Sequence, residues 1–213
     1  VQTILEGENG LVSRLEDGVP RILAVHGTVH GATYGSERSV MLGQEMVLPL
    51  HLLKNPHWDY VALGHIHRHQ AIEDDRFPPV VYSGSIERID FGEEKEPKGF
   101  VIADVQRGLT EWAFHQVEAR RFLTIRKDVR EEADPLAAVL ETITQEDIAG
   151  AIVRVIIQAE PEQEGLLRDG DIRRELHEAY FVASISKEME RAYRQRLGGE
   201  APEELTPAEL LAH

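Results

Sequence analysis

Two apolar runs in this chain end in histidine, and this restricts the folds that the chain can adopt. The motif Gly64-His65-Ile66-His67 follows one run, and His26 ends the other. Residues i and i+2 of a strand point to the same side, so His65 and His67 can converge at one strand end. His26 can reach the same edge if the two runs are strands of one sheet. We therefore predict a metal site at His26, His65 and His67, because imidazoles suit a borderline divalent ion.

Composition limits the classes of protein that this chain can belong to. The 213 residues include 42% hydrophobic residues and no cysteine, which supports a real core and excludes disulfides and thiolate metal sites. No apolar run approaches the roughly 18 residues of a membrane span, so we expect no membrane partner and a cytoplasmic location. The chain begins with Val1 rather than Met, and we expect it to be a piece of a longer polypeptide.

The chain is strongly acidic, with 23 basic and 38 acidic residues and a net charge of −15. Such a balance argues against a broad basic face that would hold DNA. Any contact with nucleic acid must then be local, assisted by metal, or supplied by a partner.

The first region, up to about residue 117, alternates short apolar runs with connections rich in Gly and Pro. We predict strands at 21–26, 60–66, 79–83, 99–105 and 109–117, and a helix at 46–54 that ends at Asn55-Pro56. The long loops 27–43 and 87–99 are expected to be functional or disordered.

The second region has the pattern of a small α+β module. The expected order is a strand at 121–129, a helix at 136–146, a strand at 151–159, a helix at 169–177 and a strand at 180–186. Asp134-Pro135 predicts the start of the first helix, with Asp as N-cap and Pro at the first helical position. The expected domains are thus 1–117 and 118–197, followed by a linker and tail at 198–213.

Imidazoles alone do not make a hydrolytic centre, and the stretch before His26 offers no carboxylate motif that would complete one. Its acids Glu6, Glu8, Glu16 and Asp17 lie in a polar stretch that a surface hairpin explains. We therefore expect the metal site in this chain to be incomplete.

Several blocks of the sequence resemble a known family. They are 23–27 (Leu-Ala-Val-His-Gly), 59–68 (Asp-Tyr-Val-Ala-Leu-Gly-His-Ile-His-Arg) and 80–88 (Val-Val-Tyr-Ser-Gly-Ser-Ile-Glu-Arg), continued by 90–94 and 98–101. They resemble the SbcD-type DNA repair nucleases of the calcineurin-like metallophosphoesterase superfamily. The resemblance covers residues from about 20 to 130 and extends more loosely through the second region.

This resemblance implies a fold and a reaction. The fold would be α/β, the second half of an αββα sandwich followed by a small α+β capping domain that orients DNA. His26 and His65 would bind one manganese ion and His67 a second, for hydrolysis of double-stranded DNA as exonuclease or endonuclease. The bridging Asp, the Asn ligand and the His that assists catalysis belong to family blocks absent here. We therefore identify no catalytic residue in this chain and expect it to be inactive alone.

The resemblance also implies contacts and partners. Ser83, Ser85, Arg68 and Arg88 flank the motif blocks and are candidates for contact with the DNA backbone. Arg120 and Arg121, with Arg126-Lys127, form a small basic cluster on the second region that could do the same. The implied partners are an SbcC-type ATPase, which acts with the nuclease in DNA repair and recombination, and a second copy of the full-length protein.

Two alternatives from other classes stay open. A phosphodiesterase of the same superfamily could act on small phosphoesters, although such a substrate needs no DNA-orienting cap. A non-catalytic fragment could instead serve as a scaffold for the ATPase. In either case the missing half of the sandwich would leave one face exposed, and we expect association with the missing segment or with another chain.

Overall fold

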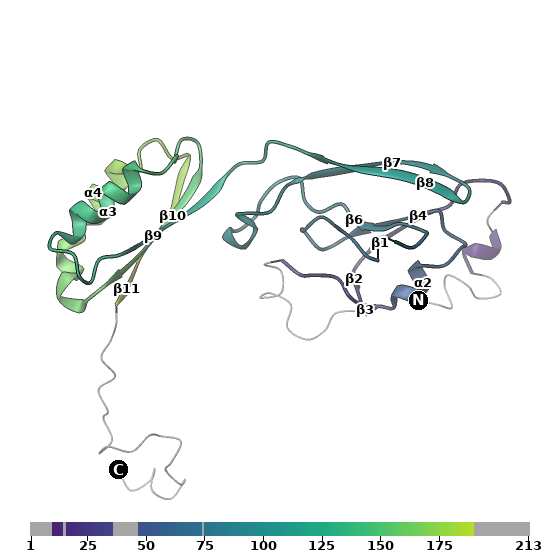
Figure 1. Cartoon of the computed structure of the whole chain (residues 1–213), viewed down its shortest axis with the longest axis horizontal. Helices are drawn as coiled ribbons and strands as arrows, with labels where there is room; N and C mark the ends of the chain where they lie inside the picture. Colours follow the sequence, from purple (N-terminus) through teal and green to yellow (C-terminus); the bar gives the residue numbers. More distant parts are fainter. Residues whose placement is uncertain (1–9, 15, 36–46, 74, 190–213) are drawn as a thin grey trace, which may run out of the picture. The chain divides into compact units, whose positions relative to one another are not determined.

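The structure is a computed structural model that describes residues 10–14, 16–35, 47–73 and 75–189. In this part of the chain the protein is mixed α/β, with several small sheets and few helices (Figure 1). It divides into two compact units. The first contains the described residues up to 124 with 148–154 and 178–183, and the second contains the remainder.

The first unit is built on a four-stranded sheet with the strand order β1-β4-β6-β5. Strands β1 (Ile22–His26), β4 (Tyr60–Gly64) and β6 (Val80–Tyr82) are parallel, and the short β5 (Gln70–Ala71) is antiparallel to β6. The predicted strands at 21–26 and 79–83 are confirmed, whereas the strand predicted at 60–66 ends at Gly64. His65 and His67 therefore lie beyond the strand, and the alternation of side chains along a strand does not bring them together. Because parallel strands point the same way, the carboxyl ends of β1, β4 and β6 meet at one edge of the sheet.

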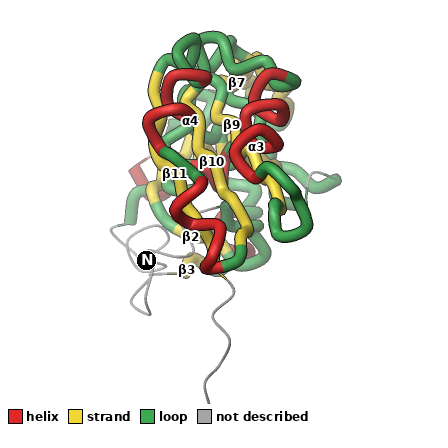
Figure 2. Tube along the Cα trace, turned by 90° about the vertical axis from the view of Figure 1, so that its left-hand side faces the viewer, coloured by secondary structure: helices red, strands yellow, loops and turns green. Residues whose placement is uncertain are grey.

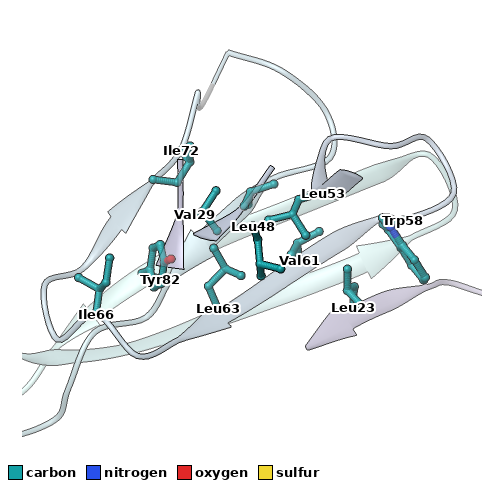
Figure 3. Close-up of a cluster of buried hydrophobic side chains, with 11 residues drawn as sticks. Leu23, Val29, Leu48, Leu53, Trp58, Val61, Leu63, Ile66, Ile72 and Tyr82 are labelled. Atoms are coloured by element: carbon teal, nitrogen blue, oxygen red, sulfur yellow. The ribbon is translucent and has the colours of Figure 1, made fainter. Parts of the chain in front are cut away.

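One face of this sheet carries the core of the first unit (Figure 3). Leu23, Val61 and Leu63 pack there against side chains from β2 (Thr28–Val29), β3 (Val47–Leu48) and α2 (Leu50–Leu53). Burial of such apolar area stabilises a fold by about 25 cal/mol per Å². Side chains alternate along β1, so Ile22 points away from this core and is 57% exposed.

A hairpin of β7 (Gly99–Gln106) and β8 (Leu109–Gln116) confirms the predicted strands at 99–105 and 109–117. Its turn is anchored by the buried Asp59, which lies just before β4. The Asp59 carboxylate accepts hydrogen bonds from the Arg107 guanidinium at 2.7 Å, the Gly108 amide at 2.8 Å and the Arg21 amide at 2.8 Å. One buried charge thus ties the hairpin turn to the beginning of the main sheet.

The predicted helix at 46–54 is wrong over its first half. Val47–Leu48 is strand β3, parallel to β2, and only Leu50–Leu53 is helical, while residue 46 lies outside the described ranges. Pro49 is the physical cause, because a residue that precedes proline is disfavoured in the helical region. The chain is therefore extended up to Pro49 and becomes helical only after it.

The long loops predicted at 27–43 and 87–99 contain more local structure than expected. Strand β2 lies at the start of the first, whose later part is outside the described residues. The second contains the 3-10 helix η3 (Phe91–Glu93), where the Asp90 carboxylate accepts a hydrogen bond from the Gly92 amide at 2.7 Å.

The α+β module follows the predicted order closely. Its elements are β9 (Phe122–Asp128), α3 (Pro135–Thr144), β10 (Ile152–Ala159), the 3-10 helix η4 (Pro161–Leu166), α4 (Asp169–Glu175) and β11 (Phe181–Met189). The sheet order is β11-β10-β9, and α3 and α4 lie side by side on one of its faces (Figure 2). Asp134 caps α3 by accepting a hydrogen bond from the Ala137 amide at 3.0 Å, as the sequence predicts.

Some expectations concern residues that the structure does not describe. The linker and tail at 198–213 lie outside the described ranges, as do Glu6 and Glu8. Glu16 and Asp17 are exposed, between the 3-10 helix η1 (Val12–Arg14) and β1. No helix within the described ranges has the length and apolar character that crossing a membrane requires.

Candidate metal centre

Two of the three predicted ligands lie next to each other at the carboxyl edge of the main sheet. His26 is the last residue of β1 and pairs in register with Gly64, the last residue of β4. His65 follows immediately, and its imidazole ring lies edge to face with that of His26, with 5.2 Å between ring centroids. The parallel register therefore brings together two histidines that are 39 positions apart in the sequence.

The backbone around this pair is unusual. His65 has a φ of 106°, a conformation that residues with a Cβ rarely adopt. Strain of this kind persists only where the surrounding structure imposes it, and it is common at functional sites. Gly64 helps to make room, because a Cβ at this position would lie 3.0 Å from Nδ1 of His26. The Gly-His pair thus permits a close approach of two imidazoles.

His67 is held by a buried carboxylate. Its Nδ1 lies 2.8 Å from Oε1 of Glu93, whose side chain is completely buried. The other carboxylate oxygen, Oε2, lies 2.7 Å from Nζ of the buried Lys98 and accepts a hydrogen bond from the Ile89 amide at 3.2 Å. Burial acts to raise the pKa of Glu93, but the hydrogen bonds from Lys98, His67 and Ile89 outweigh it and hold that pKa below its ordinary value.

Arg88 and Lys98 hold the loop that presents Glu93. The Arg88 guanidinium donates to the backbone carbonyls of Glu93 at 3.1 Å and Glu96 at 2.8 Å, and also to that of Arg120 at 3.0 Å. Lys98 Nζ donates to the carbonyl of His67 at 3.3 Å as well as to Glu93. The loop therefore has little freedom to move Glu93 away from His67.

The residues present suit a divalent metal ion, although they do not form a full ligand set among themselves. Within the described ranges, no three His, Asp or Glu side chains are grouped so that they could hold a metal. Two imidazoles do meet at the strand ends, and the third is paired with a carboxylate, as metal-bound histidines usually are. An open hollow lined by Ala24, Val25, His26, Ala62, Leu63 and Gly64 adjoins the pair.

Ser83, Ser85 and Arg68, all predicted to contact DNA, lie close to the motif in sequence or in space. Ser83 and Ser85 follow β6, and the Ser85 amide donates to the carbonyl of His67 at 3.0 Å. The hydroxyl of Ser85 donates to the carbonyl of Glu87 at 2.8 Å, and that of Ser83 to Gly84 at 3.3 Å. Arg68 is exposed.

The other three candidates differ in how their guanidinium groups are used. Arg88 is half-buried and engaged with backbone carbonyls, as described above. Arg120 and Arg121 are exposed, although they also donate to backbone carbonyls, those of Gly150 at 3.3 Å and Ala149 at 3.1 Å. Arg120 in addition stacks on the ring of Tyr180, with 3.7 Å between its Cζ and the ring centroid. Arg120 and Arg121 are thus more accessible than the half-buried Arg88 to an external phosphate, because their side chains are exposed.

Sequence reasoning missed Glu93 and Lys98 as members of the site. Both lie in blocks that resemble the nuclease family, but no spacing rule connects them to His67, 26 and 31 positions away. A charged residue inside a polar loop is expected on the surface, and only the folded loop shows that these two are buried.

No family model matches this chain. The functional interpretation therefore depends on the residues described above and on their geometry.

Proposed function

We propose that this chain is the C-terminal part of an SbcD-like, manganese-dependent nuclease that hydrolyses double-stranded DNA. Its first unit would be the second half of a metallophosphoesterase sandwich, and its α+β module would be the cap that orients DNA. It would act in the cytoplasm in DNA repair and recombination, with an SbcC-type ATPase and as a homodimer of the full-length protein.

One observation carries this proposal: the pair of imidazoles from His26 and His65 at the ends of two parallel strands, with His65 in a strained backbone conformation. A surface or core histidine needs neither a partner ring nor such a backbone. His65 has both a partner ring and a strained backbone, and His67 of the same motif is oriented by Glu93.

The mechanism assigns separate tasks to the residues of this chain. Bound divalent ions would supply Lewis acidity to the scissile phosphate. His26 and His65 would hold one ion and His67 another, each through imidazole nitrogen. The exposed Arg68, Arg120 and Arg121 would contact DNA phosphates locally, which is consistent with a chain of net charge −15.

The test is a manganese-dependent cleavage assay on linear duplex DNA. It compares the chain alone, the chain mixed with the upstream segment that would carry the missing ligands, and the same mixture with His65→Ala. We expect cleavage in the unmutated mixture and a loss of at least about 100-fold with His65→Ala, because a metal ligand is removed. His57→Ala is the matched control, since His57 is exposed in a turn away from the motif and should leave activity unchanged.

Other outcomes separate the alternatives. Hydrolysis of a small chromogenic phosphodiester without cleavage of duplex DNA would replace the nuclease with a small-molecule phosphodiesterase. Binding of the ATPase by a folded mixture that cleaves nothing would replace it with a scaffold.

A further inference from the structure

We propose that Glu93 is a positioning residue that keeps the proton of the neutral His67 ring on Nδ1, so that Nε2 carries the lone pair that binds metal. This inference deepens the proposed function and rests on it. It concerns a residue to which neither motif spacing nor the resemblance assigns a role.

The chemistry of the two side chains fixes the direction of the hydrogen bond between them. A carboxylate accepts hydrogen bonds but has none to donate. The Oε1 of Glu93, 2.8 Å from Nδ1, therefore requires Nδ1 of His67 to be the donor. In a neutral imidazole the second nitrogen then bears the lone pair, and this tautomer binds metal through Nε2.

The surroundings of Glu93 require it to be the charged partner. Its Oε2 receives two donors, Lys98 Nζ at 2.7 Å and the Ile89 amide at 3.2 Å, in a place that water does not reach. Lys98 is also fully buried, so removal of the charge from Glu93 would leave a buried ammonium without its closest partner. The arrangement of donors thus stabilises a carboxylate beside His67.

A neutral amide in this position would favour the other tautomer of His67. In Glu93→Gln, the two donors at Oε2 select the amide oxygen, which turns the NH₂ group toward His67. A donor facing Nδ1 favours the lone pair on Nδ1 and the proton on Nε2. The substitution therefore reverses the tautomer while it leaves the ring, its size and its position in the chain unchanged.

The experiment is NMR of the ¹⁵N-labelled, metal-free chain at mildly alkaline pH, above the ordinary pKa of imidazole. Long-range ¹H–¹⁵N correlations distinguish the two tautomers, and His67→Gln assigns the signals of His67. We expect the Nδ1–H form in the unmutated chain and the Nε2–H form in Glu93→Gln. Asp59→Asn is the matched control, because Asp59 is an equally buried carboxylate whose hydrogen bonds come from Arg21, Arg107 and Gly108, and it should leave His67 in the Nδ1–H form.

A titration of the same samples with Mn²⁺, in the presence of the upstream segment that would carry the missing ligands, provides the second readout, through paramagnetic broadening of the histidine signals. Glu93→Gln should weaken Mn²⁺ binding at His67 by about 10–100-fold, whereas Asp59→Asn should not. The Nε2–H form in the unmutated chain, or a Glu93→Gln variant with unchanged tautomer and Mn²⁺ response, would overturn the role of Glu93. If Mn²⁺ broadens none of His26, His65 and His67 in the unmutated chain while the tautomers behave as expected, the proposed metal centre fails instead, and with it the ligand role of His67.

Discussion

The two units of this protein differ in whether charged side chains are buried in their interiors. Among the described residues of the second unit, the fully buried side chains are apolar, namely those of Ile125, Val129, Val139, Ile143, Val155, Ile157, Ala159, Leu167, Ile172 and Leu176. In the first unit the charged side chains of Asp59, Glu93 and Lys98 are buried among apolar ones. Buried charges cost free energy unless they are paired. Here Asp59 is paired with Arg107 and Glu93 with Lys98, and these pairs hold the hairpin turn and the loop that contains Glu93 in position.

The acidic side chains show the same contrast. Asp59 in the first unit is buried and accepts three hydrogen bonds from Arg107, Gly108 and Arg21. Asp128 in the second unit is exposed, and its hydrogen bonds with Arg130 lower its pKa to about 2. A large pKa shift at an exposed group reflects a local pair and not the stability of the fold.

The largest effect is expected in the apolar core of the second unit. Ile157 of β10 is completely buried, so Ile157→Ala should lower the free energy of unfolding by about 3–4 kcal/mol, measured by urea denaturation. Ile156→Ala, at a partly exposed neighbour, is the control and should cost much less. Equal losses for the two variants would mean that this core is not the packed interior described here.

The next largest effect concerns the buried charge at the hairpin turn. Asp59→Asn should cost about 2–3 kcal/mol, because it weakens the interaction with Arg107 and leaves one N–H donor without an acceptor. Burial acts to raise the pKa of Asp59, but the hydrogen bonds from Gly108, Arg107 and Arg21 prevail and lower it below 3.8.

This lowered pKa determines the sign of the pH dependence. The stabilisation from Asp59 is present above the ordinary pKa of 3.8 and is lost as the pH falls through the lower folded-state value. Unfolding measured from neutral to strongly acidic pH should therefore show a smaller acid-induced loss in Asp59→Asn than in the unmutated chain. An unchanged pH profile would contradict the anchoring role of Asp59.

A glycine of each unit gives a smaller effect, with opposite signs. Gly84 has a φ of +79°, and a Cβ there would lie 2.7 Å from the carbonyl oxygen of His67. Gly84→Ala should therefore cost about 1–2 kcal/mol and disturb the His67 NMR signals. Gly170 in α4 has open space around its Cα, so Gly170→Ala should stabilise the second unit by roughly 0.5 kcal/mol. If Gly84→Ala left the free energy of unfolding unchanged, the loop after β6 would be free to move away from the motif.

The smallest effect is expected at Asp128. Asp128→Asn should leave the thermal unfolding midpoint unchanged at neutral pH, because the pair with Arg130 is exposed to solvent. In the unmutated chain, an NMR titration should show the lowered pKa of the Asp128 carboxyl, at about 2. A clear drop in that midpoint would mean that an exposed charge pair of the second unit also stabilises the fold, which would contradict the difference between the two units.

Local patterns explain which parts of the fold could be predicted. The α+β module follows from β-branched runs, the Asp134-Pro135 helix start and helical periodicity, all of which are short-range signals. The strands β2, β3 and β5 are two residues long and carry no periodicity, so no sequence pattern distinguishes them. The helix predicted at 46–54 failed because Pro49 prevents helix before it, a local rule that the apolar pattern concealed.

The sequence by itself determined the strand-end histidines, the cysteine-free and acidic character of the chain, and the order of the α+β module. Only the tertiary structure decided that His26 and His65 lie side by side, because parallel pairing of β1 with β4 sets their register. It also decided that Glu93 and Lys98 are buried beside His67. Periodicity reports which face of an element is apolar, whereas the burial of a charge depends on partners that are distant in the sequence and meet only in the folded chain.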